Sequence, residues 1–527
     1  DLAVAVGATG DDTLDDANRE AVDAGTPWLA VEVGGVGGHP LVAASVAGFE
    51  PGSGCYACLQ RRVGAAVETT PDAVETPRRE VRLAGALAGR EAARALDGED
   101  IGGLLVEVPG VRRSFPPAPG CPVCGGEPDR TPDRSADAPG FETVVGRAER
   151  AVDERAGVVT EVGERESYPA PYYMARVADT SGMSDAEAPR HAAGVAADWN
   201  RAYVKAVGEA LERYSAAVYR ESALPAGTPD EVEGAVPPAA FVRPDDADTG
   251  AERRWVSGEH LATGEAVHLP ADLVFHPPPG RVRPPITTGL GVGASGAGAL
   301  AAGLSEVVER DAAMLAWYST FEPLALAVER ENYRALARRA RSEGLSATAL
   351  LLTQDVDVPV VGAVVHREEW PRFAAGSAAD LDAGRAATAA LAEALQNWME
   401  LRGMGRADAA DAGAAVGRYA DFPREVRGLV EVESTVPAAD VGPADPPERG
   451  EALDELVERV AGAGLDAYAT RLTPRDVAAL GFEAARVVVP AAQPLFVGDA
   501  YFGERARTVP RELGFRPRLD RPFHPYP

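Results

Sequence analysis

The sequence has almost no lysine, few cysteines and no long apolar run. Of its 527 residues, 52 are Lys or Arg, and Lys205 is the only lysine among them. Acidic residues number 81, which gives a net charge of -29. Such a charge repels the phosphates of nucleic acids, so a DNA or RNA partner is disfavoured. This composition, with abundant Ala, Gly, Val and Asp, resembles that of proteins from salt-loving archaea.

Two further absences bear on location. No run approaches the roughly 18 apolar residues that suggest a membrane-spanning helix, and no charged-then-apolar leader opens the chain. We therefore expect a cytoplasmic protein without a membrane partner. The sequence starts at Asp1, directly before the strand-like LAVAV, and we expect that a segment precedes it. A chain of 527 residues is too long for one core, so two or three domains are expected.

The hydrophobic pattern predicts a small α/β module followed by a larger α+β domain. The module begins β-α-β, with strands over 2–6 and 28–33 around a helix over 13–25. The Pro- and Asp-rich stretch 127–140 marks the predicted boundary, which gives domains over 1–135 and 136–527. Further helices are predicted at 79–96, 199–221, 298–318, 331–343, 383–402 and 450–463, with strand-like runs between them.

All four cysteines fall into two Cys-x-x-Cys pairs, Cys55 with Cys58 and Cys121 with Cys124. Each pair lies beside the glycines that a tight turn needs, and together they supply four thiolates for a tetrahedral zinc ion. Two short disulfides or a redox pair are the alternatives. A reducing cytoplasm disfavours disulfides, and a thioredoxin-like site uses one pair. We therefore predict one structural zinc, with no coordination position left open for catalysis.

A Glu-x-x-Glu-Arg pattern is shared by the segments EALER, beginning at Glu209, and EVVER, beginning at Glu306. In the first copy Glu209, Glu212 and Arg213 share a helical face with Lys205, apart from an apolar face. Two carboxylates one turn apart can hold one metal ion. The alternative is a solvated helix surface on which Lys205, Glu209 and Arg213 form ion pairs four residues apart.

The stretch GVGASG over 291–296 matches the glycine pattern of dinucleotide-binding loops. Such a loop must follow a strand of a parallel sheet and must be followed by an acidic residue about twenty positions later. Pro284 and Pro285 break the expected strand, and no acid ends a following strand at that distance. We therefore do not expect a dinucleotide site here.

Several segments taken together resemble the YcaO family in order and spacing. They are VGEALERYSAAVYRE, TTGLGVGASGAGALAAGLSEVVERDAAMLAWY, ALAEALQNWMELRG, VVVPAAQPLF and the terminal FHPYP. In the front part AVDAGTPWLAVEVGG, GFEPGSGCYACLQRRV and CPVCGG resemble the zinc-bearing, ThiF-like module of azoline-forming cyclodehydratases. Both halves in one chain are the fused cyclodehydratase arrangement, and this order is more specific than any single motif.

The resemblance implies an ATP-dependent enzyme that forms thiazoline or oxazoline rings from Cys, Ser or Thr in a ribosomally made peptide. In that family, paired glutamates bind the magnesium ions that carry ATP. The positions that match this site are Glu209, Glu212, Glu306, Glu309, Arg310, Glu393 and Gln396, with Lys205 where the family typically has a small hydroxyl residue. Magnesium prefers hard oxygen ligands, which agrees with these carboxylates.

The sequence departs from the family pattern near the second motif. Gly298 and Ala294 stand where a further metal-binding glutamate and an asparagine are expected. Lys205 then either replaces one divalent charge with a fixed ammonium or belongs to a degenerate site. The alternatives are a catalytically weakened scaffold that binds a precursor peptide or a partner protein, and an enzyme that makes another backbone modification such as a thioamide.

The terminal RPFHPYP resembles the proline-rich tail that reaches back into the active site of azoline-forming relatives. His524, Pro525 and Pro527 match that tail, whereas Phe523 stands where its first proline is expected. Proline fixes φ and lacks an N–H, so the tail loses little entropy when it docks. The resemblance implies that His524 and the carboxylate of Pro527 take or deliver protons. A frayed terminus without a role is the alternative.

The resemblance also implies cofactors and partners. The cofactors are ATP, Mg²⁺ and one structural Zn²⁺ on Cys55, Cys58, Cys121 and Cys124. The partners are a ribosomal precursor peptide, a flavin dehydrogenase or leader-binding protein, and a second copy of the chain in a homodimer. Removal of the zinc is expected to destabilise the front module without directly touching the nucleotide site.

Overall fold

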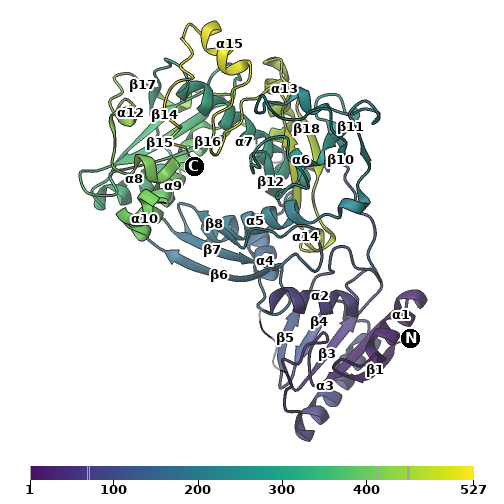
Figure 1. Cartoon of the computed structure of the whole chain (residues 1–527). Helices are drawn as coiled ribbons and strands as arrows, with labels where there is room; N and C mark the ends of the chain where they lie inside the picture. Colours follow the sequence, from purple (N-terminus) through teal and green to yellow (C-terminus); the bar gives the residue numbers. More distant parts are fainter. Residues whose placement is uncertain (1, 68, 70–71, 412–414, 448–450, 527) are drawn as a thin grey trace.

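Two regions with separate sheets follow one another along the chain in the computed structural model (Figure 1), which describes residues 2–67, 69, 72–411, 415–447 and 451–526. The first region holds a sheet in the order β1-β2-β3-β4-β5. Its elements are β1 (Ala3–Ala8), α1 (Thr13–Ala24), β2 (Trp28–Val33), β3 (Ala44–Phe49), α2 (Tyr56–Ala66), α3 (Arg78–Leu96), β4 (Leu104–Glu107) and β5 (Val111–Ser114). β1 and β2 pair in parallel around α1, as the predicted β-α-β pattern requires.

The second region contains three sheets. The first comprises β6 (Val159–Glu166), β7 (Tyr172–Val177) and β8 (His191–Val195). The second has the order β11-β10-β18-β19-β12 and comprises β10 (Arg253–His260), β11 (Ala266–Pro270), β12 (Leu290–Gly293), β18 (Tyr468–Arg471) and β19 (Glu483–Val488), with β9 (Ala226–Gly227) on β10. The third has the order β16-β15-β14-β13-β17 and comprises β13 (Leu324–Ala327), β14 (Ser346–Leu351), β15 (Val360–His366), β16 (Phe373–Ala379) and β17 (Thr435–Pro437).

Three long helices connect these sheets in a ring. α5 (Trp199–Ala217) packs on β8 and on β12, α7 (Gly296–Trp317) packs on β12 and on β16, and α9 (Ala383–Met404) packs on β16 and on β8. Each helix therefore bridges two sheets, and Figure 1 shows the three around one central region. The remaining helices lie outside: α4 (Phe141–Ala151), α6 (Ala271–Val274), α8 (Glu331–Ser342), α10 (Arg406–Asp411), α11 (Ala415–Tyr419), α12 (Arg424–Arg427), α13 (Ala452–Gly462), α14 (Arg475–Ala479) and α15 (Arg505–Glu512).

Local sequence signals fix where the three central helices begin and how closely they pack. Asp198, Ser295 and Asp382 each cap a helix by accepting a hydrogen bond from the backbone N–H three residues later. Two glycines permit close approach of helix and strand. A Cβ at Gly194 of β8 would lie 2.2 Å from the backbone nitrogen of Ala206, and one at Gly376 of β16 would lie 2.6 Å from the backbone nitrogen of Ala394.

The structure confirms the α/β and α+β class and contains the predicted helices, with one error near the glycine-rich stretch. The strand β12 begins after Pro284 and Pro285, so the prolines do not break it, and it leads directly into α7. β12 pairs antiparallel with β19 rather than within a parallel sheet, which still argues against a dinucleotide fold. Among the described residues, none of the helices has the length and apolarity needed to cross a membrane.

Candidate ATP and metal sites

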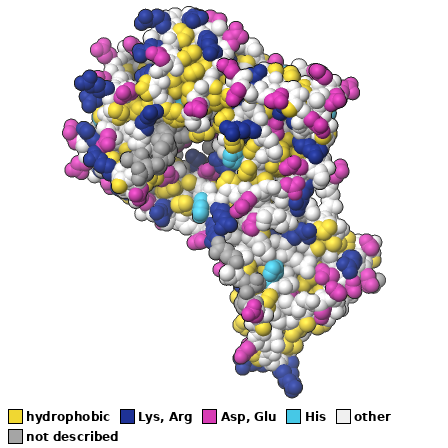
Figure 2. Space-filling view, in the orientation of Figure 1, with side chains coloured by type: hydrophobic (Ala, Val, Ile, Leu, Met, Phe, Trp, Pro, Cys, Tyr) yellow, Lys and Arg dark blue, Asp and Glu magenta, His cyan; other side chains and the backbone are white. Residues whose placement is uncertain are grey.

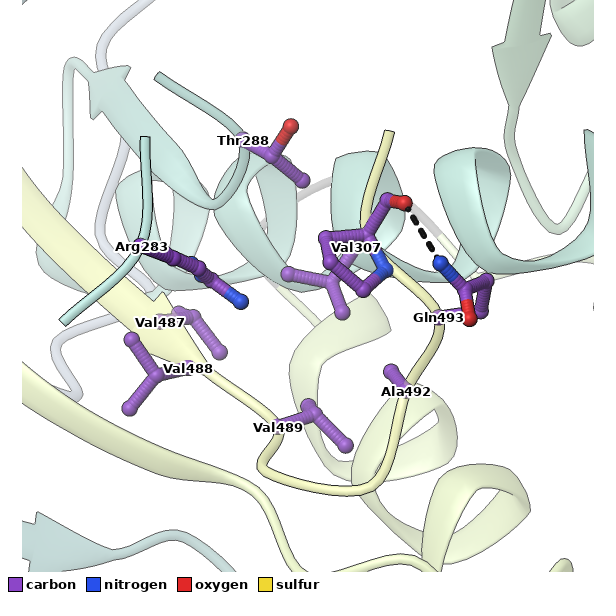
Figure 3. Close-up of a pocket in the computed structure, with 9 residues that line it drawn as sticks. Arg283, Thr288, Val307, Val487, Val488, Val489, Ala492 and Gln493 are labelled. Carbon is purple, nitrogen blue, oxygen red and sulfur yellow. Dashed lines mark hydrogen bonds between the residues drawn. The ribbon is translucent and has the colours of Figure 1, made fainter. Parts of the chain in front are cut away.

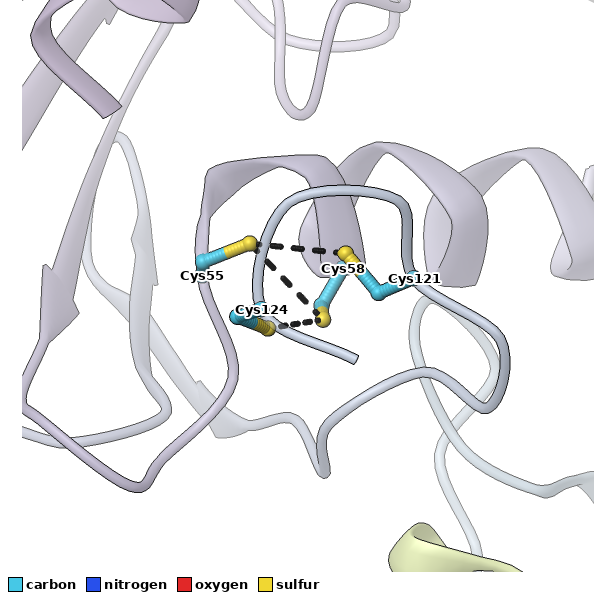
Figure 4. A group of neighbouring side chains, drawn as sticks. All are labelled: Cys55, Cys58, Cys121 and Cys124. Atoms are coloured by element: carbon cyan, nitrogen blue, oxygen red, sulfur yellow. Dashed lines mark hydrogen bonds between the residues drawn. The ribbon is translucent and has the colours of Figure 1, made fainter. Parts of the chain in front are cut away.

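The four cysteine side chains meet in one cluster between α2 and the loop that follows β5 (Figure 4). Their sulfur atoms all lie within 4.8 Å of one another, and none forms a disulfide. The Cys55–Cys121 and Cys58–Cys124 distances between sulfur atoms are 3.6 and 3.4 Å. Zinc–sulfur bonds of about 2.3 Å in a tetrahedron require sulfur atoms about 3.8 Å apart. The donor set therefore fits one tetrahedral metal ion.

A cation from the second region contacts this thiol cluster. Arg475 of α14 donates from Nη1 to the Cys124 sulfur at 3.2 Å and to the Cys124 carbonyl at 2.8 Å. A guanidinium beside the sulfur favours the thiolate that a metal ion needs. Because Arg475 lies far from the cysteines in the sequence, no spacing rule indicated this contact.

The thiol cluster also packs against α5. Cys55, Cys58 and Cys121 share a buried core with Val207 and Leu211 of that helix. Val207 and Leu211 belong to the apolar face of α5, so the expected separation between the zinc site and the nucleotide site stays a prediction.

A buried ion pair strengthens the same contact between the two regions. Arg62 of α2 pairs with Asp476 of α14, and both side chains are fully buried. The Tyr214 hydroxyl of α5 donates to the same Asp476 carboxylate at 2.6 Å, while Arg62 donates to the Pro117 carbonyl at 3.1 Å. Removing one partner of such a pair typically costs about 3–5 kcal/mol, because the other charge stays buried. α5 is therefore fixed to the front region on its apolar side.

The opposite side of α5 faces a group of carboxylates from α7 and α9. Glu309 accepts a hydrogen bond from the Ser377 hydroxyl at 2.6 Å, and Glu393 accepts one from the Ser377 backbone N–H at 2.6 Å. Arg310 lies 3.5 Å from Glu309 and 3.9 Å from both Glu306 and Glu393. The second motif and α9 therefore come together as the resemblance implied.

The first motif approaches the same group from α5. Glu209 lies 3.3 Å from Arg213 and 3.4 Å from the Ala193 backbone nitrogen, whereas Glu306 accepts a hydrogen bond from the Gly289 N–H at 3.0 Å. Glu212 is electrostatically coupled to Glu306 and Glu209. The Glu209–Arg213 ion pair of the solvated-surface alternative is present, but Glu212 is not on an open surface.

Burial and crowding make these carboxyls weak acids. Burial, opposed in part by Arg213, raises the pKa of Glu212 to about 8, and the Glu306 and Glu209 charges act in the same direction as burial. Burial likewise raises the pKa of Glu393 to about 7 and that of Glu309 above its usual range, against the charge of Arg310. Crowded carboxylates with raised pKa values need further positive charge, and a divalent cation supplies it.

Lys205 and Gln396 lie at the edge of this group. The positive charge of Lys205 lowers the pKa of Glu309 and Glu393, against the larger effect of burial. Gln396 donates to Glu400 at 3.0 Å, and the Tyr172 hydroxyl donates to the same carboxylate oxygen at 2.8 Å. Gln396 is therefore held by its own helix and by β7.

The C-terminal tail packs on α7. Figure 2 shows a hollow in the face of the molecule on which Figure 1 shows the three helices. Tyr526 belongs to the apolar cluster that contains Leu304, Val307 and Val308 of α7. Trp317 donates from its indole to the Pro522 carbonyl at 2.8 Å, and Tyr419 bonds to the Phe523 carbonyl. The described part of the tail is therefore docked rather than frayed.

His524 is buried within this tail. Its ring nitrogens lie 3.0 Å from the carbonyl oxygens of Tyr526 and Phe496, and its ring stacks on Phe523. Burial lowers the pKa of His524 to about 4. These surroundings favour an anchoring role for His524 over proton transfer at neutral pH. Pro525 is also buried, whereas Pro527 lies outside the described residues.

Comparison with known proteins identifies the chain. The family model of the YcaO cyclodehydratases, described as ATP- and Mg²⁺-binding, matches residues 193–493. The chain belongs to the YcaO family. The match covers α5, α7 and α9 with both Glu-x-x-Glu-Arg motifs.

Solved structures extend the likeness to the front region. A heterocyclase in complex with substrate and cofactor has the same fold, with a TM-score of 0.74 at 20% identity over 97% of this chain and 79% of that one. A YcaO protein from Methanopyrus kandleri, bound with AMPPCP and Mg²⁺, is 29% identical with a TM-score of 0.54 over 67% of this chain and 90% of that one.

A sequence relative matches a smaller part. An uncharacterised protein from Methanothermobacter thermautotrophicus is 31% identical over 189 residues, which are 33% of this chain. The matched part is 47% of that relative, so the chain spans about half the relative's length.

Two positions of this YcaO region supply no side-chain ligand. Gly298 donates its N–H to the Ser295 hydroxyl that caps α7, and Ala294 offers its carbonyl to Arg147 at 3.5 Å. Conversely, the sequence reasoning missed Ser377, which contacts both Glu309 and Glu393. Ser377 lies in FAAGSAA, a strand of small residues that carries no signal of a site.

Proposed function

We propose that this YcaO protein is an ATP-dependent cyclodehydratase that forms thiazoline or oxazoline rings in a ribosomally made peptide. The observation that carries the proposal is the convergence of glutamates from α7 and α9 on Arg310, with Glu212 of α5 close enough to Glu306 to raise the Glu212 pKa, next to the docked tail. The fold shared with a heterocyclase over nearly the whole chain supports it.

The reaction joins a side chain to the preceding amide. The thiol or hydroxyl of Cys, Ser or Thr bonds to the amide carbon and loses its proton, which leaves an oxyanion. That oxygen bonds to the γ-phosphorus of ATP as ADP departs. Loss of the amide proton and of phosphate then forms the C=N bond of the ring. The protein's task in such transfers is to position groups and neutralise charge.

We propose that Glu209, Glu212, Glu306, Glu309 and Glu393 hold magnesium with ATP, and that Arg310 neutralises phosphate charge. Lys205 and Gln396 line the same site. Bound magnesium supplies positive charge that stabilises phosphate oxygens. The raised pKa values of Glu212, Glu309 and Glu393 support this assignment, because a cation favours their ionised forms.

We further propose that the cysteines hold one structural zinc and that the tail docks the reacting peptide. His524 anchors the tail to the Phe496 carbonyl, and Pro525 stiffens it. The carboxylate of Pro527 is then the candidate proton acceptor. We place the boundary between the two domains near residue 135. The proposed partners are the precursor peptide and a dehydrogenase or leader-binding protein, and the proposed oligomer is a homodimer.

One assay tests the function. The protein is incubated with short Cys/Ser/Thr-rich peptides, magnesium and ATP, and the peptide masses are followed. The expected result is the loss of one water per ring, dependent on ATP. ATP consumption without loss of water would instead favour another backbone modification.

A second assay isolates the tail. Deletion of residues 523–527 is expected to abolish ring formation while ATP binding changes little, because the glutamates lie on helices rather than on the tail. An unchanged yield of rings in the truncated protein would remove the tail from the mechanism.

A specific observation favours a second candidate, a peptide-binding scaffold without turnover. Gly298 and Ala294 leave the second motif without two ligands that the family pattern provides. This candidate predicts peptide binding by calorimetry together with no ATP consumption above background.

A further inference from the structure

The C-terminal tail is fixed from two sides. On the first side, the His524 ring nitrogen Nε2 lies 3.0 Å from the Phe496 carbonyl. The segment that carries Phe496 is itself fixed to α7, because the Gln493 backbone N–H donates to Asp311 at 2.6 Å. Figure 3 shows Gln493 with the bond of 3.0 Å that its side-chain amide donates to the Pro494 carbonyl. This side of the tail is therefore anchored to α7.

The second side is formed by residues 419–427, which we call the clasp. It comprises the last residue of α11, a turn and α12. The Tyr419 side chain is buried, and its hydroxyl donates to the Phe523 carbonyl. Arg521 of the tail donates from Nη2 to the Glu425 carbonyl at 3.3 Å. The clasp therefore contacts the tail just before His524.

Trp317 of α7 completes this contact. Its ring lies 3.9 Å from the Arg521 guanidinium carbon and meets the Tyr419 ring edge-on at 6.0 Å. Its indole N–H donates to the Pro522 carbonyl at 2.8 Å. Each residue from Arg521 to Phe523 thus contacts α7 or the clasp, and the tail lies between them.

The clasp contains an unusual backbone conformation. Among the residues that the structure describes, Phe422 is the one non-glycine residue with a positive φ, which is 55°. Glycine adopts this conformation readily, whereas a bulky side chain disfavours it. Such a conformation persists only where the surrounding structure imposes it. The contacts of Phe422 should therefore show what fixes the clasp.

The Phe422 ring packs on the end of the β15–β16 hairpin. His366 and Phe373 form a cross-strand pair there, and their ring centroids lie 5.5 and 5.6 Å from that of Phe422, with interplanar angles of 18° and 14°. The Ala420 carbonyl also accepts a hydrogen bond from the Arg372 N–H at 2.7 Å. The clasp therefore connects the end of this hairpin to the tail.

We propose that Tyr419 and Phe422 are positioning residues for the tail. The stacked Phe422 ring fixes the clasp to the hairpin, and the Tyr419 hydroxyl sets the place of the Phe523 carbonyl. The residues after Phe523 then follow that position. Neither residue is catalytic, since both act through the tail. The consequence for ring formation rests on the proposed function, in which the tail docks the reacting peptide.

Hydrogen exchange of the tail amides, measured by mass spectrometry without ATP or peptide, tests the contact. Tyr419→Phe is expected to speed exchange in the C-terminal segment about fivefold, because one hydrogen bond to the tail is lost. Tyr333→Phe is the matched control. Tyr333 is a buried tyrosine of α8 in a separate apolar cluster, so exchange in the tail should stay as in the wild type.

Variants of Phe422 separate the ring from the backbone conformation. Phe422→Gly accommodates the positive φ but lacks the ring, and it is expected to speed exchange in the tail at least as much as Tyr419→Phe does. Phe422→Tyr keeps an aromatic ring and should restore slow exchange. Slow exchange in Phe422→Gly would overturn the role of the stacked ring.

Steady-state ring formation tests the consequence. Tyr419→Phe is expected to lower kcat about fivefold and to leave the KM for ATP unchanged, because the glutamates lie on helices apart from the clasp. Unchanged exchange in Tyr419→Phe, or faster exchange with an unchanged kcat, overturns the positioning role and leaves the proposed function standing. Faster exchange in Tyr419→Phe, with no rings formed by the wild type, supports the contact and contradicts the proposed function alone.

Discussion

The thiol cluster and the glutamate group are both sets of candidate anionic ligands, yet they differ in how closely their ligand atoms gather around one point. Four sulfur atoms lie within 4.8 Å of one another, whereas no three carboxylates among the described residues gather in this way. Four thiolates saturate a tetrahedral ion, but dispersed carboxylates leave positions for water and phosphate. The geometry of the thiol cluster therefore suits a structural ion, and that of the glutamate group suits an ion that keeps positions for a ligand.

The two sets lie on opposite sides of one helix. Cys58 belongs to the same buried apolar cluster as Val207 and Leu211 of α5, and Glu209 and Glu212 lie on the other side of that helix. A change at the thiol cluster can therefore affect the glutamate group by altering the position of α5. The following predictions test how far the two sets act separately.

The largest expected effect is on turnover. Glu309→Gln should reduce ATP consumption on the order of 100-fold, because it removes a charge next to Arg310 while the side chain keeps its size. Steady-state ATP assays measure turnover, and thermal unfolding checks that the variant keeps its fold. Glu458→Gln, at an exposed position of α13, is the control. Unchanged turnover in Glu309→Gln would show that the glutamate group is an ordinary helix surface without a role in ATP consumption.

The next effect is on stability. Cys58→Ser, or removal of metal by a chelator, should lower the melting temperature by about 10 °C, since it weakens a structural metal site worth several kcal/mol. Because α5 packs on the cluster, the KM for ATP should rise as well. Metal analysis together with melting curves checks whether loss of the metal lowers the melting temperature. A KM that stays constant in the metal-depleted protein would show that the two sets are independent.

The third effect depends on pH. Glu212 and Glu393 have pKa values of about 8 and 7, above the 4.5 of an unfolded glutamate. Their protonated forms favour the fold, so their contribution is present below pH 4.5 and is lost as pH rises through 7 and 8. Magnesium binds the ionised forms, so its stabilisation should grow between pH 6 and 9. Melting curves with and without magnesium measure it, and a constant shift would argue against these ligands.

The smallest expected effect concerns Lys205. Lys205→Ser removes a positive charge that lowers the pKa of Glu309 and Glu393. The midpoint of the pH dependence of magnesium binding should therefore move upward by about half a unit. Lys205→Arg, which keeps the charge, should leave the midpoint in place. A downward shift in Lys205→Ser would contradict this electrostatic role.

The sequence predicted the helices that carry the site because their apolar spacing is clear. Leu304, Val307 and Val308 are buried at the positions that the helical period assigns. The resemblance to the YcaO family also indicated that Glu209 and Glu306 belong together. The order of the sheets was not predictable, since strands such as β3 and β16 consist of small residues without alternation.

Contacts between segments that lie far apart in the sequence could not be predicted either. Ser377, Arg475 and Asp476 acquire their roles only when the chain is folded, because each meets one partner at least 68 positions away. His524 was recognisable as a docked residue, but its burial was not.

The buried pair of Arg62 and Asp476 has a consequence for how this chain can be rebuilt. A chimera that exchanges the front region for that of a relative would leave Asp476 facing whatever residue replaces Arg62. Without an arginine there, the exchange would place a lone charge in the joint between the two parts. The unit of exchange is therefore not the stretch before the proline-rich boundary, but that stretch together with α14.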